Sequence, residues 1–128
     1  MWVIQTTPEY LSRNKRYEKK HWRELAAVLD NLDTFLKTLQ NGVKPRQVKF
    51  GFIHPEPQGV LAIDQKGSGP NLAQTRLYVY PDEEHEVLYL LTVGDKQTQS
   101  IDVQFCKMCV SQLREGDTKT DAKEEGLP

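Results

Sequence analysis

The longest regular pattern of apolar residues in the chain begins at Trp22 and ends at Leu39. Its apolar positions recur in alternating steps of three and four, and further apolar residues widen the stripe: Trp22, Leu25, Leu29, Leu32, Leu36 and Leu39, with Ala26, Val28 and Phe35. Such spacing places these side chains on one face of an α-helix. Because Asn41-Gly42 suits a left-handed C-cap, we predict that this helix ends near Gln40.

Another helical stretch is predicted to begin at Pro8. Thr7 can accept a hydrogen bond from a free amide as N-cap, and Pro8 suits the first helical position. The pattern leaves open whether residues 8–40 form one helix or two. A break is expected at residues 19–21, since one straight helix of ~50 Å rarely fits a domain of this size.

Short β-prone runs lie on both sides of these helices. The first covers residues 2–6, and after a Pro-rich connector with one extended piece at residues 48–53 come three more: 59–65, 74–80 and 86–93. Turn-forming residues separate the last three runs, which predicts an antiparallel meander. Residues 87–93 are apolar on both faces except Thr92, so they should form a central strand covered on both sides.

A last amphipathic helix should open near Ser100, with Asp102 in its first turn. Its apolar positions are Ile101, Phe105, Met108, Cys109 and Leu113. The predicted fold class is therefore α+β: an N-terminal strand and helical section packed on an antiparallel β-meander, with a C-terminal helix.

Length and charge fit one domain followed by a tail. The chain has 128 residues, 38% of them hydrophobic, and a net charge of -1. Residues 1–114 carry 15 basic and 13 acidic side chains, a net charge of +2, whereas residues 115–128 carry two basic and five acidic ones. We predict a single domain over residues 1–114 and a disordered acidic tail over residues 115–128, because the tail has almost no apolar surface to bury.

Several function classes are not favoured. No apolar run reaches the ~18 residues of a membrane span, and the start does not resemble a signal peptide, so a cytoplasmic protein is expected. Cys106 and Cys109 form a C-x-x-C pair, but three scattered histidines supply no matching second pair for zinc. We interpret both cysteines as small core residues, with a metal or redox site as the alternative, and expect no metal or cofactor.

Basic residues gather between Arg13 and Arg23. This run contains six basic side chains and one acid, and its candidate RNA contacts are Lys15, Arg16, Lys19 and Lys20. The pattern is typical of a phosphate-binding surface and equally of a solvated helix face.

The strand at residues 76–80 suggests a second contact surface. Alternation places Leu77 and Val79 on the core face and Arg76, Tyr78 and Tyr80 on the other. Bases could stack on the two tyrosines while Arg76 binds phosphate. Alternatively, the tyrosines lean on a helix and Arg76 pairs with Glu86. Lys66 and Lys96 are expected at the same end of the sheet.

Three segments resemble the RelE/ParE superfamily of bacterial type II toxins. The basic helical segment is similar to that of the family, as are the strand pair 75–80 and 87–93 with its following Gly94-Asp95-Lys96. The run from Gln97 to Asp102 resembles the opening of the last helix in HigB-like members. The likeness spans roughly residues 2–113.

This resemblance implies a compact sheet with helices on one face and a metal-independent mRNA interferase. In such toxins the ribose 2′-OH attacks the adjacent phosphate of mRNA on the ribosome, and basic side chains stabilise the charge. Arg76 and Lys96 match the basic family positions, and Lys66 is a looser match. The implied partners are an antitoxin protein and ribosome-bound mRNA.

The chain departs from the family in three ways, two of which are an atypically long turn over residues 67–74 and the Pro-rich connector. No tyrosine or histidine follows Lys96, where many active members have a general acid. Two alternatives therefore stay open: a catalytically weakened relative, and a non-enzymatic protein-binding module of the ParE-like or antitoxin-binding kind.

Overall fold

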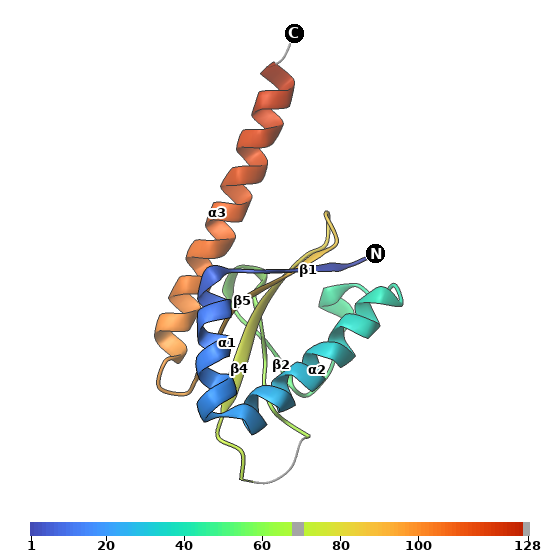
Figure 1. Cartoon of the computed structure of the whole chain (residues 1–128). Coiled ribbons are helices and arrows are strands. Elements are labelled where there is room, and N and C mark those ends of the chain that lie inside the picture. Colours follow the sequence, from blue (N-terminus) through green and yellow to red (C-terminus); the bar gives the residue numbers. More distant parts are fainter. Residues whose placement is uncertain (68–70, 127–128) are drawn as a thin grey trace.

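The fold is one mixed sheet between two layers of helix (Figure 1). A computed structural model describes residues 1–67 and 71–126, those after residue 116 by their backbone alone. Its strands are β1 (Val3–Thr6), β2 (Ile53–Pro55), β3 (Leu61–Ile63), β4 (Thr75–Asp82) and β5 (Val87–Asp95), and its helices are α1 (Pro8–Lys20), α2 (Trp22–Gln40) and α3 (Gln99–Gly126), with short 3₁₀ turns η1 (Pro45–Gln47) and η2 (Pro57–Gly59).

The strands lie in the order β1-β5-β4-β3-β2. β2, β3, β4 and β5 pair antiparallel in sequence order, while β1 pairs parallel with β5. The predicted α+β class, the meander and the C-terminal helix are confirmed. β5 lies between β1 and β4 and is buried on both faces, as its apolar sequence predicts.

The helical section is divided where the sequence indicates. Thr7 caps α1 by accepting a hydrogen bond from the Tyr10 amide at 3.0 Å, and His21 separates α1 from α2. α2 ends at Gln40, followed by Gly42 with φ +94°, a conformation that glycine adopts without strain. Trp22 differs from the prediction: it is 60% exposed, because the buried face of α2 begins only at Leu25.

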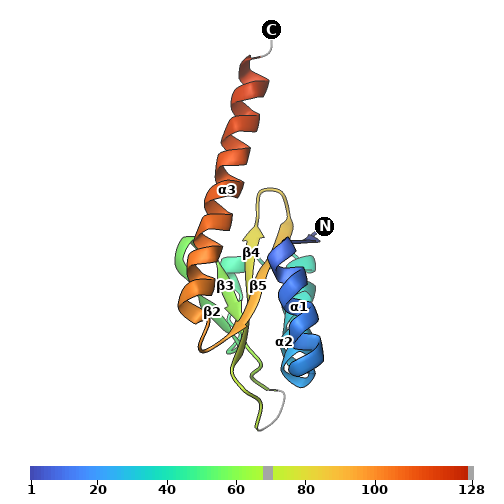
Figure 2. The ribbon, with the colours of Figure 1, turned by 60° about the vertical axis from the view of Figure 1, so that its left-hand side comes forward.

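Helices cover both faces of the sheet (Figure 2). α1 and α2 pack on the face of Leu77 and Val79, and α3 packs on the face of Tyr78 and Leu91. The arrangement implied by the resemblance, with helices on one face, is therefore wrong for this chain.

α3 buries a different stripe from the one predicted. Its buried residues are Asp102, Cys106 and Val110, spaced four apart, whereas Ile101 and Met108 are exposed. The stripe is rotated because a charged residue, Asp102, is turned inward. The backbone of α3 continues to Gly126, but side chains after residue 116 and all of residues 127–128 lie outside the described part, so the predicted disorder of residues 115–128 stays a prediction.

Candidate functional site

The three predicted catalytic residues lie at one end of the sheet. Arg76 pairs in register with Gly94, so the start of β4 adjoins the end of β5, and Lys96 follows directly. Lys66 comes shortly after Ile63, the last residue of β3, which pairs with Leu77. We call these residues the cationic end: Lys66, Arg76 and Lys96.

Arg76 occupies an unusual environment. Because side chains alternate along β4, it lies on the same face as Tyr78, toward α3. Its side chain is partly buried, and within the described residues its Nε is buried without a hydrogen-bond partner. A charged donor left unpaired costs free energy, so the Arg76 guanidinium is well suited to an acceptor oxygen brought by a ligand.

A histidine and a carboxylate lie beside the cationic end. His54 Nε2 is 2.5 Å from Asp64 Oδ2. Asp64 Oδ1 accepts a hydrogen bond from the Lys66 amide at 2.8 Å, and Lys66 Nζ lies 3.9 Å from Asp64 Oδ2. The Asp64 side chain is buried, whereas that of His54 is 29% exposed. This pair was not predicted from the sequence, because it depends on the pairing of β2 with β3, and β2 is only three residues long.

The turn that carries Lys66 is fixed from two sides. The Asn31 side chain of α2 donates to the Asp64 and Lys66 carbonyl oxygens at 2.8 and 3.1 Å. On the other side, the Gln65 side chain accepts a hydrogen bond from the Thr75 amide of β4 at 3.1 Å. These contacts hold the Lys66 backbone next to the first residues of β4.

The tyrosines do not form an open platform. Tyr78 is fully buried against α3, and Tyr80 is half-buried, with its ring 6.4 Å from that of Tyr89. The expectation of an exposed aromatic face is wrong, because α3 covers it. The alternative pairing of Arg76 with Glu86 is also wrong, since Glu86 lies at the opposite end of the sheet and binds the N-terminal ammonium at 3.0 Å.

The basic residues of α1 lie on the opposite side of the sheet from Arg76. Lys15, Arg16, Lys19 and Lys20 are all exposed. The end of α1 and the start of α2 lie at the same end of the molecule as the loop after β3 (Figures 1 and 2). Arg16, Lys19 and Lys20 therefore extend the cationic end around the rim of the sheet rather than across one face.

Arg13, in contrast, has a structural role. Its Nη1 lies 3.2 Å from the buried carboxylate of Asp102 and donates to the Val93 carbonyl oxygen at 3.1 Å. Its Nε binds Glu9 at 3.0 Å. Arg13 thus connects α1, β5 and α3.

The turn between β5 and α3 sets the position of Lys96. Asp95 Oδ1 accepts hydrogen bonds from the amides of Gln97 and Thr98, and the Thr98 hydroxyl donates to Asp102 Oδ2 at 2.7 Å. A Cβ at Gly94 would come within 1.9 Å of Asp102 Oδ2, so the close approach of α3 requires glycine there.

Tyr17 of α1 lies near Asp95 of the same turn. Burial, together with Asp95, raises the pKa of the Tyr17 hydroxyl to about 12.

The cysteines take the predicted role of small core residues. Both are free thiols, Cys106 is buried, and burial raises the pKa of both thiols, which disfavours the reactive thiolate. In the part of the chain that the structure describes, no three His, Cys, Asp or Glu side chains are grouped to hold a metal ion. None of the helices described is both long and apolar enough to cross a membrane.

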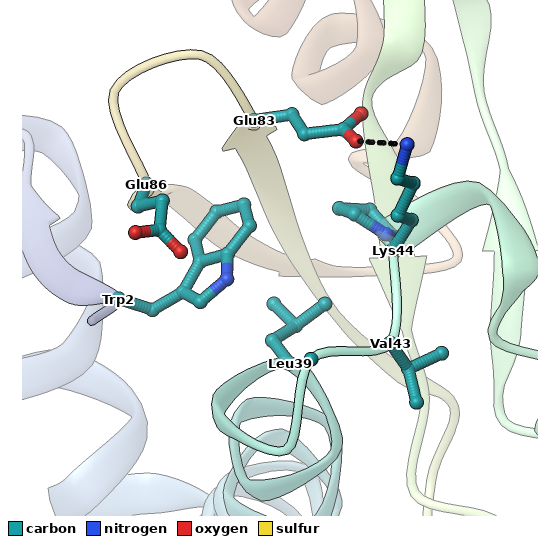
Figure 3. Close-up of a pocket in the computed structure, with 8 residues that line it drawn as sticks. Trp2, Leu39, Val43, Lys44, Glu83 and Glu86 are labelled. Carbon is teal, nitrogen blue, oxygen red and sulfur yellow. Dashed lines mark ion pairs between the residues drawn. The ribbon is translucent and has the colours of Figure 1, made fainter.

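Two hollows lie away from the cationic end. One, of about 210 Å³, is formed by Trp2, Leu39, Lys44, Glu83 and Glu86 among others, with Lys44 Nζ 3.9 Å from Glu83 Oε1 (Figure 3). It lies at the turn between β4 and β5, opposite the cationic end. The other, of about 480 Å³, is mostly apolar, follows the β2 edge and includes Arg46 and Lys49.

Comparison with protein-family models, with curated proteins and with solved structures finds no match for this chain.

Proposed function

We propose that the chain is a toxin of the RelE/ParE type that binds and cleaves mRNA at the cationic end. The observation that carries this proposal is Arg76, a partly buried arginine whose Nε has no hydrogen-bond partner among the described residues. Lys66 and Lys96 lie at the same end of the sheet, and this gathering of three positive charges supports the proposal.

The cationic end suits phosphoryl chemistry without a metal ion. As the 2′-oxygen of a ribose attacks the adjacent phosphorus, negative charge grows on the phosphoryl oxygens. Positioned guanidinium and ammonium groups stabilise that charge. Such a protein would act in the cytoplasm on ribosome-bound mRNA and would be held inactive by an antitoxin segment covering the basic surface.

The test is cleavage of ribosome-bound mRNA by purified protein. Replacing one group that stabilises transition-state charge typically lowers the rate by ~10²–10³-fold, and we expect this for R76A and for K96A. K44A is the control, because Lys44 pairs with Glu83 at the far end of the sheet. Unchanged cleavage and growth arrest in both R76A and K96A would overturn the proposal.

A second candidate is a protein-binding module without catalysis. The hollow along β2 favours it, because an apolar groove with Arg46 and Lys49 could receive an acidic amphipathic segment. Copurification of wild type with a small acidic protein, lost on changing Arg46 and Lys49 to glutamate and accompanied by no RNA cleavage, would support this second function.

A further inference from the structure

His54 is partly exposed but contacts a buried carboxylate. Its Nε2 contacts the carboxylate of Asp64, whose side chain is 7% exposed, while the His54 ring itself remains 29% exposed. The chain holds another histidine–aspartate pair, His85 with Asp82, at 2.8 Å. That pair lies at the β4–β5 turn, at the other end of the sheet and more open to solvent.

Hydrogen bonding fixes the proton on the His54 ring. An ionised carboxylate only accepts hydrogen bonds, so the nitrogen facing Asp64, Nε2, must carry the proton. The other nitrogen, Nδ1, then keeps its lone pair when the ring is neutral. Asp64 is itself held by the Lys66 amide and lies near the Lys66 ammonium, so it cannot easily turn away from His54.

Strand register brings this pair next to Arg76. His54 pairs with Ala62, and Ala62 pairs with Tyr78, so His54 lies on the face of the sheet that α3 covers further along. Asp64 and Arg76 are one position beyond the last β3–β4 pair, Ile63 with Leu77. β2 and β4 are two strand spacings apart, ~10 Å, and Arg76 is two residues along β4 from Tyr78, with Asp64 directly after the strand between them. Histidine, lysine and arginine have long side chains, so we infer that those of His54, Lys66 and Arg76 can converge on one phosphodiester and its ribose.

We propose that His54 is a catalytic residue that takes the proton from the ribose 2′-OH, and that Asp64 is the residue that positions it. This inference rests on the proposed function. In the step, the 2′-oxygen loses its proton to His54 Nδ1 and bonds to phosphorus, the bond from phosphorus to the 5′-oxygen breaks, and solvent protonates the departing 5′-oxygen. The products are a 2′,3′-cyclic phosphate and a 5′-hydroxyl, and His54 then returns its proton to solvent.

The experiment measures single-turnover cleavage of ribosome-bound mRNA between pH 6 and 9. The main variant is H54Q, because a glutamine amide can still donate to Asp64 but cannot accept the proton. General bases contribute typically ~10²–10⁴-fold, so we expect a loss of that size, and in H54Q no rise of the rate with pH from histidine deprotonation. H54A should lose as much and regain activity when imidazole is added. D64N should keep part of the activity with a shifted pH profile.

H85A is the matched control, since it removes a histidine from the other histidine–aspartate pair, and its rate should stay within twofold of wild type. Circular dichroism confirms that each variant is folded. If wild type and H85A cleave, R76A and K96A do not, and H54Q retains the wild-type rate and pH profile, the role of His54 is overturned while the proposed function stands. If wild type cleaves no mRNA, both fall.

Discussion

Beneath α3, three polar atoms are buried without a hydrogen-bond partner among the described residues: Arg76 Nε, Tyr78 Oη and Thr92 Oγ1. Tyr78 and Thr92 are paired in register, and Arg76 is two residues before Tyr78 on the same face. A buried polar atom without a partner costs about 1–3 kcal/mol. The two differ in exposure: the Tyr78 side chain is fully buried, whereas part of the Arg76 side chain beyond its buried Nε is open to solvent.

The Tyr78 hydroxyl can be removed without changing the buried ring. Y78F removes the unpaired hydroxyl while keeping the ring, so we expect the free energy of unfolding to stay equal or to rise by about 1 kcal/mol. RNA affinity should not change, because α3 separates Tyr78 from solvent. Urea unfolding and fluorescence anisotropy with a single-stranded RNA measure the two quantities. A tenfold weaker RNA affinity in Y78F would show that the Tyr78 hydroxyl reaches RNA and would contradict its burial under α3.

At the scale of elements, the ion pair of Arg13 with Asp102 holds α1 and α3 together across the end of β5. The Asp102 side chain is 1% exposed and that of Arg13 16% exposed. Burial raises the pKa of Asp102 above its ordinary 3.8, while Thr98 and Arg13 lower it. The two helices on opposite faces of the sheet are therefore coupled through a buried charge that Thr98 and Arg13 together stabilise.

R13A should reveal this coupling through its pH dependence. Removing one partner of a buried pair costs ~3–5 kcal/mol, because the other charge stays buried. Without Arg13, the folded-state pKa of Asp102 rises further above 3.8, so the folded protein binds a proton more readily than the unfolded chain. Stability is then recovered as the pH falls, and the cost of R13A should be smaller at pH 5 than at pH 8.

Urea unfolding of wild type and R13A at both pH values measures this difference. K37A is the control, because Lys37 forms an exposed pair with Asp33 and its loss should have little effect on stability at either pH. A cost of R13A that is equal at pH 5 and pH 8 would contradict the assignment of the buried charge to Asp102.

The elements that could be predicted from the sequence are those with a local signal. Thr7-Pro8 at the start of α1 and Asn41-Gly42 after α2 set helix ends through their own backbone preferences. The apolar run in β5 likewise predicts that this strand is buried on both faces. The buried face of α3 could not be predicted in this way, because the oppositely charged partner of Asp102 is Arg13, which is 89 positions earlier in the chain.

Only part of the candidate site could be predicted from the sequence. Alternation along β4 correctly separates Leu77 and Val79 from Arg76 and Tyr78. It cannot say whether the second face is open, since that depends on where α3 packs. The contact of His54 with Asp64 depends on a strand of three residues and carries no sequence pattern.

At the scale of the whole molecule, charge is unevenly distributed between the two ends of the sheet. The cationic end, with the exposed lysines of α1 around its rim, lies opposite the β4–β5 turn, which carries Asp82, Glu83, Glu84 and Glu86. Although the net charge of the chain is near zero, basic side chains therefore gather at one end of the sheet and acidic ones at the other. An approaching polyanion is attracted to one end and repelled by the other.

K19A/K20A tests whether the rim of the cationic end takes part in RNA binding. Each phosphate contact that is lost should lower the slope of log affinity against log salt by ~0.7 for a single strand, so the double variant should bind more weakly and depend less on salt. The control K37A/K44A removes the same charge at the far end of the molecule. Anisotropy of a labelled single-stranded RNA between 50 and 200 mM salt gives both slopes. An equal effect of the two double variants would mean that only net charge matters, and that RNA does not approach by the cationic end.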